Sequence, residues 1–298
     1  MKKIAITGLS GVIGSRLSKS LPEGFKIYNL YHTHKEPIKG VMPKHIELLK
    51  PESIDACLNE ISPEIIVHMA SATHIDRCEE DRKYGEKGDV WKVNVNATNT
   101  IATYCKKNKT QLIFLSTECV FDGEELSYDE KSVKNPKNWY GVTKSKAEDI
   151  IFAACPTASI IRAVIAYNEQ DREKTLFGKI LQGFKNGKQF KAVTDQIITP
   201  TYTDDIVKAI KLLIQKPKSG IFHISPEDKT TAYDFALKIA EKFGFDQSLI
   251  VETTLNEYFG AERAQLRLKN SCLDGKWTQS QLKFTPLNIT QVLDKINL

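Results

Sequence analysis

The sequence predicts an α/β fold, in which a doubly wound parallel sheet is followed by a smaller C-terminal lobe. Three observations support this prediction. Short apolar runs alternate with longer amphipathic stretches through the first two-thirds of the chain, a glycine-rich segment follows the first apolar run, and the alternation stops after Tyr167. Near-continuous apolar strands between helices indicate a parallel sheet covered on both faces. Right-handed crossovers then give the doubly wound topology.

The expected elements follow one another along the chain in a regular order. Strands are expected at apolar and β-branched runs, which lie at 3–7, 26–31, 65–70, 111–116, 158–165 and 220–225. Helices are expected at the stretches between and after them, which lie at 14–21, 51–61, 89–108, 140–154, 204–215 and 231–243. The acidic start of 204–215 suits the positive end of a helix dipole.

Composition restricts the class of protein. The 298 residues are 41% hydrophobic and 27% charged, as is usual for a globular protein with a sizeable core. The net charge of +5 is too small to indicate a nucleic-acid partner, and no apolar run approaches the roughly 18 residues that span a bilayer. Six cysteines without a C-x-x-C pair are expected to be reduced thiols, and the six histidines show no metal-ligand spacing. We therefore expect a cytoplasmic protein with no metal site and no membrane partner.

The segment 7–14 fits T-G-x-x-G-x-x-G between the first expected strand and helix. Glycine lets the backbone turn tightly and approach a pyrophosphate, and the following helix start offers free N–H groups. A dinucleotide-binding (Rossmann) domain is predicted from this context. The residues expected at the cofactor phosphates are Gly8, Ser10, Gly11, Val12, Ile13 and Gly14.

The end of the second strand favours one cofactor over the other. NAD-selective sites place an acidic residue there for the ribose 2′-hydroxyl. Here His32, His34 and Lys35 precede the first acidic residue, Glu36, and these basic side chains suit a 2′-phosphate. NADP(H) is the expected cofactor, with NAD(H) as the alternative; a polar loop without cofactor contact is the structural alternative.

Three residues form a candidate catalytic group. Tyr140 and Lys144 form Y-x-x-x-K, which places both on one face of a helix. A free tyrosine has a pKa near ~10, and an ammonium nearby is expected to lower that pKa. Thr117 follows the strand at 111–116, where ligands bind in such sheets. Each feature alone is weak, but glycine turn, hydroxyl, tyrosine and lysine in this order favour a catalytic site.

The sequence resembles the extended short-chain dehydrogenase/reductases, and more narrowly the dTDP-4-dehydrorhamnose reductase group. The likeness covers most of the chain, and it is carried by IVHMASA at 66–72, VNVNAT at 93–98, STECVFDG at 116–123, NWYGVTK at 138–144, and DQ at 195–196 followed by TPTY at 199–202. The resemblance implies that the cofactor also contacts Ala70, Ser71, Ala72, Asn94, Tyr140 and Lys144. It further implies substrate contacts at Thr73, Glu118, Cys119, Arg162, Thr201 and Arg267, with a structural ion pair as the alternative for Arg162.

Two departures from the group's pattern lie near the expected substrate pocket. Glu118-Cys119 replaces Asp-Tyr, and Arg267-Leu268 stands where the group often has Arg-Pro. No carboxylate cluster suits the Mg²⁺ that rhamnose-pathway members are described with. These departures concern which sugar and base are bound, and they leave the hydride chemistry unaffected.

The resemblance implies NADPH-dependent reduction of the keto group of a nucleotide-linked 4-keto-6-deoxy sugar. Tyr140 would donate the proton, Lys144 would hold the ribose, and Thr117 would orient the carbonyl. The alternatives are a nucleotide-sugar epimerase or dehydratase, and a non-catalytic NADP-binding subunit like the regulatory beta subunit of methionine adenosyltransferase. Only Glu118 follows Thr117 where a dehydratase usually has an acidic pair, which argues against that class.

The predicted cofactor domain covers 1–166, and 201–225 returns to it. The predicted substrate lobe covers 167–200 and 226–298. A homodimer is the family habit that the resemblance implies.

Overall fold

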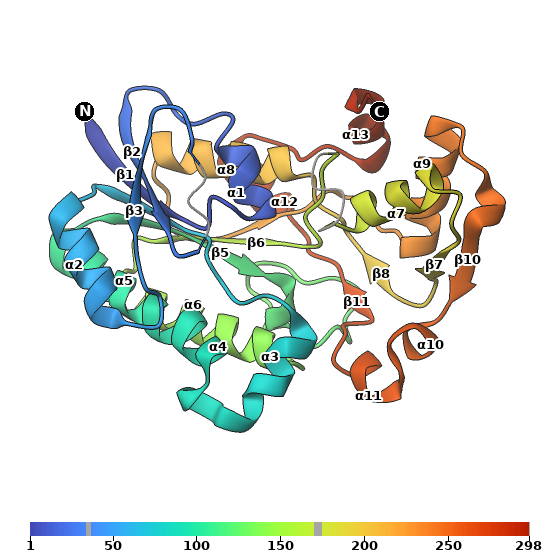
Figure 1. The fold of residues 1–298 in the computed structure, drawn as a ribbon, viewed down its shortest axis with the longest axis horizontal. Coiled ribbons are helices and arrows are strands. Elements are labelled where there is room, and N and C mark those ends of the chain that lie inside the picture. The colour runs from blue at the N-terminus through green and yellow to red at the C-terminus, as the bar shows by residue number, and fades with distance from the viewer. Residues whose placement is uncertain (34–36, 170–174, 298) are drawn as a thin grey trace.

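Seven parallel strands form the centre of the protein in a computed structural model that describes residues 1–33, 37–169 and 175–297 (Figure 1). The strand order is β3-β2-β1-β4-β5-β6-β9. The strands are β1 (Lys2–Thr7), β2 (Phe25–Tyr31), β3 (Val41–His45), β4 (Ile65–His68), β5 (Gln111–Thr117), β6 (Ser159–Ala163) and β9 (Gly220–Ile224). The order reverses between β1 and β4, and ligands bind beyond the carboxyl ends of strands at such a switch point. The predicted fold class is confirmed.

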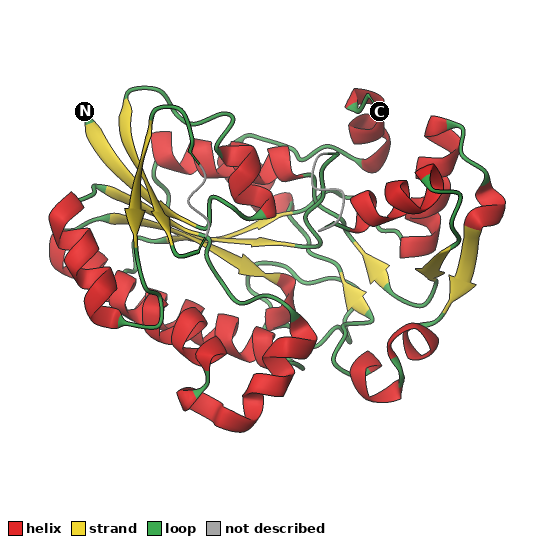
Figure 2. Ribbon diagram, in the orientation of Figure 1, coloured by secondary structure: helices red, strands yellow, loops and turns green. Residues whose placement is uncertain are grey.

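Helices cover both faces of this sheet (Figure 2). The helices and turns of this part are α1 (Val12–Leu17), α2 (Pro51–Ile61), α3 (Ile75–Asp81), η1 (Arg82–Lys87), α4 (Asp89–Trp91), η2 (Lys92–Asn96), α5 (Ala97–Asn108), η3 (Glu118–Val120), α6 (Trp139–Ala154) and α8 (Thr203–Gln215). One face packs against α2, α5 and α6, and the other against α1 and α8. Successive strand residues point to opposite faces, so Ile160 joins the first core and Ile161 the second.

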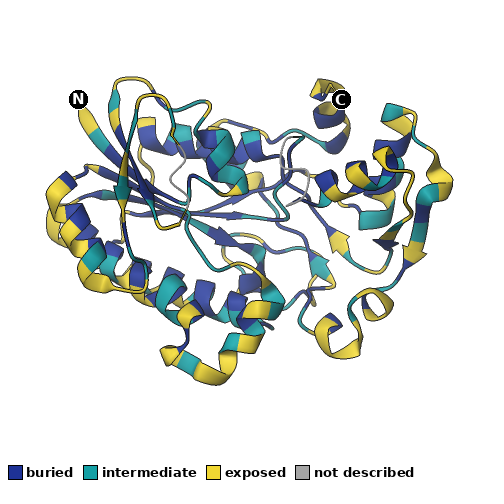
Figure 3. Cartoon of the chain, viewed as in Figure 1, coloured by how far each residue is buried: buried dark blue, intermediate teal, exposed yellow. Residues whose placement is uncertain are grey.

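The strand interiors are buried along nearly their whole length (Figure 3). In β4, all four residues are buried, as expected for a strand between two helical layers. The exception is β3, which has no buried residue and lies at the edge of the sheet. It was not predicted, because Pro43, Lys44 and His45 break the apolar pattern and proline is confined to edge strands.

The remaining part of the chain forms its own core. Its elements are α7 (Leu176–Lys185), β7 (Phe190–Val193), β8 (Ile197–Ile198), α9 (Ala232–Phe243), η4 (Gln247–Leu249), β10 (Ile250–Thr253), α10 (Leu255–Phe259), α11 (Ala261–Ala264), β11 (Asn270–Ser271), α12 (Lys276–Leu282) and α13 (Ile289–Lys295). Side chains of α7, α9 and α13 pack together around Phe177 and Phe235. By contrast, Leu282 and Phe284 pack in the core beside α8, although they fall in the segment 226–298. No helix in the described ranges is long and apolar enough to cross a membrane.

The helix predicted at 89–108 is a composite. It consists of α4, a π-helical turn (η2) and α5. Such single π turns inside helices are frequent at functional sites. This one carries Asn94, whose side chain reaches the loop after β4.

Candidate functional site

The glycine turn between β1 and α1 is closed by contacts that only glycine permits. Gly8 has a φ of +80°, and a Cβ there would lie 2.8 Å from the backbone nitrogen of Ala70. A Cβ on Gly14 would lie 2.1 Å from the carbonyl oxygen of Gly8. The N–H of Gly11 donates to that same oxygen at 3.1 Å. The turn therefore folds back on itself.

Thr7, at the end of β1, ties the turn to β4. Its hydroxyl oxygen accepts from the backbone N–H groups of Met69 and Ala70, both at 3.1 Å, and lies 2.8 Å from Nδ1 of His68. Burial, followed by the charge of Lys144, lowers the pKa of His68 to about 3, so its ring is neutral. The two strand ends are thus fixed relative to each other.

A cavity of about 800 Å³ begins at this turn and runs along the carboxyl ends of β4, β5 and β6. That volume suits a cofactor together with part of a substrate. Most of the predicted site residues line it: Gly8, Ser10, Gly11, Val12, Ile13, Gly14, His32, Ala70, Ser71, Ala72, Thr73, Thr117, Glu118, Cys119 and Tyr140. The predicted His34 and Lys35 lie outside the described residues.

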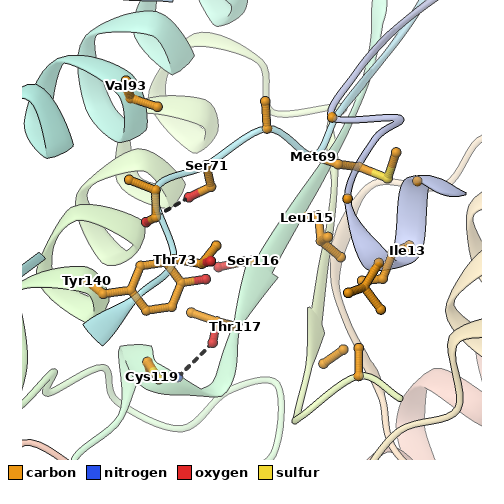
Figure 4. Close-up of a pocket in the computed structure, with 18 of the residues that line it drawn as sticks. Ile13, Met69, Ser71, Thr73, Val93, Leu115, Ser116, Thr117, Cys119 and Tyr140 are labelled. Atoms are coloured by element: carbon orange, nitrogen blue, oxygen red, sulfur yellow. Dashed lines mark hydrogen bonds between the residues drawn. The ribbon is translucent and has the colours of Figure 1, made fainter. Parts of the chain in front are cut away.

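Tyr140 and Thr117 face the same part of the cavity (Figure 4). Tyr140 lies in the first turn of α6, which begins where Asn138 accepts a hydrogen bond from the N–H of Gly141. Its ring points toward the end of β5, where Ser116 and Thr117 lie (Figure 4). The strand-end hydroxyl and the helical tyrosine singled out in the sequence therefore lie beside the same part of the cavity.

The pKa of Tyr140 differs from the expectation. Burial raises it well above its usual value, and Cys119 and Glu118 raise it further, while a hydrogen bond with Thr117 acts in the opposite direction. The expected lowering by Lys144 is absent. The phenol therefore keeps its proton at neutral pH, which suits a proton donor.

Lys144 lies one helical turn beyond Tyr140 and is buried behind the cavity wall. Its Nζ donates to the carbonyl oxygen of Leu115 at 2.6 Å and lies 3.8 Å from the centre of the Phe114 ring. Burial lowers the pKa of Lys144 to about 7, and the carboxylate of Glu148 acts in the opposite direction.

Asn94 does not line the cavity, but it bonds to Ser71 and Ala72, which do. Its Oδ1 accepts from the N–H of Ala72 at 2.8 Å and from the hydroxyl of Ser71 at 2.9 Å. Its Nδ2 donates to the carbonyl of Ala72 at 3.0 Å and to the hydroxyl of Thr143 at 2.9 Å. All four hydrogen-bonding positions of the amide are used, so Asn94 joins the loop after β4 to α6.

Arg162 does not line the cavity in this structure. It is 1% exposed, and its guanidinium pairs with Glu148 through Nε at 2.9 Å and Nη2 at 2.6 Å. Ser116 donates to the same carboxylate at 2.6 Å, and His223 Nε2 lies 3.3 Å from Nη1. Burial would raise the pKa of Glu148, but Arg162 and Ser116 outweigh it and hold that pKa low. The structure thus has the ion pair that was the alternative interpretation of Arg162.

A second cavity of about 280 Å³ adjoins the first at Glu118 and Cys119. Arg267 lines it, and its guanidinium bonds both carboxylate oxygens of Asp76 at 2.6 and 2.9 Å while lying 4.2 Å from the Phe259 ring. This pair links α3 to the C-terminal lobe.

Of the residues predicted to contact substrate, Glu118 lines the cavities and Thr201 does not. Glu118 is at the junction of the cavities; burial raises its pKa, although its Oε2 accepts from the Thr117 hydroxyl at 2.7 Å. Thr201 lines neither cavity, because its buried hydroxyl donates to the carbonyl of Ile224 at 3.1 Å.

Several site residues were missed in the sequence. Glu148 had a usable signal, because it lies four residues after Lys144 on the same helical face. Asp76 and Phe259 had none, because α3 and α10 are short and carry no periodic pattern.

The chain resembles one family over nearly all its length. The family described as RmlD substrate binding domain matches residues 1–296. A probable low-salt glycan biosynthesis reductase of Haloferax volcanii is 27% identical over 282 residues, which cover 93% of this chain and 91% of the relative. A dTDP-4-dehydrorhamnose reductase of Aggregatibacter actinomycetemcomitans is 25% identical over 307 residues, covering 99% and 98%.

A relative of another kind and a solved structure also match. The methionine adenosyltransferase 2 subunit beta of Danio rerio is 26% identical over 273 residues, which cover 89% of this chain and 81% of the relative. The crystal structure of a dTDP-4-dehydrorhamnose reductase from Bacillus anthracis in complex with NADP superposes with a TM-score of 0.85, at 23% identity, over 99% and 98% of the two chains. At that identity the likeness supports the fold.

Proposed function

The chain belongs to the RmlD substrate binding domain family of extended short-chain dehydrogenase/reductases, and from that premise we propose that it reduces the keto group of a nucleotide-linked 4-keto-6-deoxy sugar with NADPH. One observation carries the proposal. The Tyr140 phenol and the Thr117 hydroxyl face a single cavity whose other end is the glycine turn. A relative named as a dTDP-4-dehydrorhamnose reductase covers nearly the same length, which supports this class of substrate.

The residues present fit a dinucleotide. Gly8 and Gly14 give a turn that side chains would block, and Gly11 lines the cavity beside them. In the described part of the loop after β2, His32 and Thr33 provide no acidic group for a 2′-hydroxyl. This supports NADP(H) as the cofactor, with NAD(H) as the alternative.

Each residue of the site then has a defined task. The dinucleotide, when bound, supplies hydride to the carbonyl carbon. Tyr140 holds a proton at its phenolic oxygen and releases it to the developing alkoxide. The Thr117 hydroxyl turns from Glu118 toward the substrate oxygen and orients it. Lys144, which the sequence pattern assigns to the ribose, is fixed behind the cavity wall by the hydrogen bond from its Nζ to the carbonyl of Leu115.

The test is turnover by the purified protein on a panel of nucleotide-linked 4-keto-6-deoxy sugars, followed by NADPH absorbance. Removing a general acid typically costs about 10²–10⁴-fold in rate. We expect that loss in Tyr140→Phe, with NADPH binding retained, and no loss in Tyr84→Phe, whose side chain is exposed on η1.

Three outcomes would contradict the proposal. Near-normal turnover in Tyr140→Phe would remove the phenol from the mechanism. Product formation without net NADPH consumption would indicate an epimerase or dehydratase. Tight NADPH binding without turnover on any sugar, together with a stoichiometric partner, would indicate a regulatory subunit like the beta subunit among its relatives.

A further inference from the structure

Three potential metal ligands meet at the edge of the sheet, outside the group formed by Thr117, Tyr140 and Lys144. β2 and β3 pair in parallel with Tyr31 opposite His45. His32 directly follows β2, His45 ends β3, and Glu47 lies two residues further on. The carboxyl ends of both strands therefore bring the three side chains together, although His32 and His45 are distant in sequence.

Two of the distances between their ligand atoms are close to those of a coordination sphere. Oε1 of Glu47 lies 3.4 Å from Nδ1 of His32 and 3.2 Å from Nε2 of His45. All three ligand atoms lie within 4.8 Å of one another. A tetrahedral ion with bonds of about 2.0–2.1 Å separates its ligand atoms by roughly 3.3–3.4 Å. Two of the three ligand–ligand edges already have this length.

Neighbouring contacts hold the ligands in this arrangement. The rings of His32 and His45 stack at 6.2 Å between centroids, and the Tyr31 ring packs edge-on against His45 at 5.5 Å. The backbone N–H of Glu47 donates to the hydroxyl of Ser53 at 3.0 Å, which fixes the residue at its backbone. Among the described residues, the carboxylate of Glu47 pairs with these two histidines and with no lysine or arginine.

The chemistry of this donor set is selective. Two imidazoles and one carboxylate suit zinc and similar borderline divalent ions, whereas Mg²⁺ and Ca²⁺ prefer sites built from oxygen. Three protein ligands leave a fourth tetrahedral position for water or an anionic oxygen.

We propose that His32, His45 and Glu47 bind one divalent ion of the zinc class, with three protein ligands and an open fourth position. The site lies at the rim of the dinucleotide cavity, because His32 lines that cavity and a smaller one beside Thr33 and Ile46. It stands on its own geometry, so it holds whether or not the protein is a keto-sugar reductase.

The test is a titration of the purified full-length protein with Co²⁺, whose visible absorption reports tetrahedral coordination, followed by displacement with Zn²⁺ in a calorimeter. We expect one ion per chain. Loss of even a partner behind a metal ligand typically weakens metal binding about 10–100-fold, so His45→Ala and Glu47→Gln should each weaken it by at least that factor. His74→Ala is the matched control, because that histidine is also exposed but lies at the start of α3, after β4 rather than at the ends of β2 and β3.

Circular dichroism checks that each variant is folded, which the exposure of His45 favours. The proposal is overturned if the protein binds no stoichiometric ion. It is equally overturned if His45→Ala and Glu47→Gln bind as tightly as the parent, since the three side chains would then form only a hydrogen-bonded group. Binding that His74→Ala abolishes would place the ion elsewhere and would also refute it.

Discussion

Replacing Glu148 with glutamine should destabilise the protein far more than replacing a surface glutamate. The carboxylate of Glu148 is fully buried and accepts three hydrogen bonds, two from Arg162 and one from Ser116. Glutamine has nearly the same shape, so the change removes charge and leaves the packing largely intact. Among the residues that the structure describes, Glu148 is the carboxylate that pairs with the guanidinium of Arg162, which is 1% exposed, so the variant would leave this charge uncompensated.

The magnitude follows from this burial. Breaking a buried ion pair by removing one partner costs about 3–5 kcal/mol, because the remaining charge is left uncompensated. We expect the free energy of unfolding of Glu148→Gln to fall by about that amount. The double variant Glu148→Gln, Arg162→Met should regain most of the loss, since it also removes the buried guanidinium that the single variant leaves without a counter-charge.

Urea unfolding at neutral pH measures both changes. Glu124→Gln is the matched control, because its carboxylate is 65% exposed and pairs with Lys137 at the surface. Such exposed pairs contribute about 0–1 kcal/mol. A Glu148→Gln variant within about 1 kcal/mol of the parent, or a double variant less stable than the single one, would show that the reasoning about uncompensated charge is wrong.

Three further predictions concern glycines and pH. A Cβ on Gly14 would lie 2.1 Å from the Gly8 carbonyl oxygen, so Gly14→Ala should weaken NADPH binding by about 1–3 kcal/mol, or roughly 10–100-fold, in a fluorescence titration. A Cβ on Gly141 would lie 2.0 Å from the Cys119 carbonyl oxygen, so Gly141→Ala should lower both the urea midpoint of unfolding and the turnover. A Cβ on Gly183 in α7 would meet nothing closer than 3.5 Å. Gly183→Ala should therefore leave both quantities equal or raise the midpoint, since alanine favours a helix by about 0.8–1 kcal/mol over glycine. Burial lowers the pKa of His68 and of His223 to about 3, and an unfolded imidazole titrates near ~6.5. Between these values the unfolded chain binds more protons than the folded protein, so the free energy of unfolding should fall as pH drops below about 6.5, by up to roughly 1.4 kcal/mol per pH unit for each histidine. Urea midpoints that stay constant from pH 7 to pH 5 would contradict this pH dependence. An equal loss of stability in Gly141→Ala and Gly183→Ala would contradict the argument from the Cβ contacts.

The fold could be predicted where local pattern and burial agree. The helix expected at 51–61 is α2 (Pro51–Ile61), and the strand expected at 111–116 extends by one residue in β5. Both have continuous patterns that end at turn residues. β3 could not be predicted in this way, because an exposed edge strand needs no apolar residues and contains Pro43. The meeting of His32 with His45 was lost with it, since that contact depends on the register of β2 and β3.

In the candidate site, too, some residues could be placed from the sequence and others could not. Residue type and spacing identified Thr117 and Tyr140, because each lies at the end of an element whose position the pattern fixes. For Arg162, the sequence left a substrate contact and an ion pair open, and the alternation of side chains along β6 helps to decide between them. Its side chain shares a face with Ile160, which packs toward α6, whereas the residues on the other parity pack toward α8. Glu148 lies on α6 at that face, so parity places Arg162 on the same side of the sheet as Glu148, with which it pairs.

The wall beside the glycine turn and the wall of the second cavity are held by different interactions, and this difference bears on substrate specificity. On the cofactor side, Thr7 ties β1 to the loop after β4, and Asn94 ties that loop to α6. These bonds join β1, the loop after β4 and α6 to one another, so this wall is pre-organised for the reaction. On the other side, the second cavity is lined by Arg267, whose ion pair with Asp76 joins the lobe to α3. A substrate group that competes for the Arg267 guanidinium would have to break that pair, so differences between substrates should be felt there more than at Tyr140.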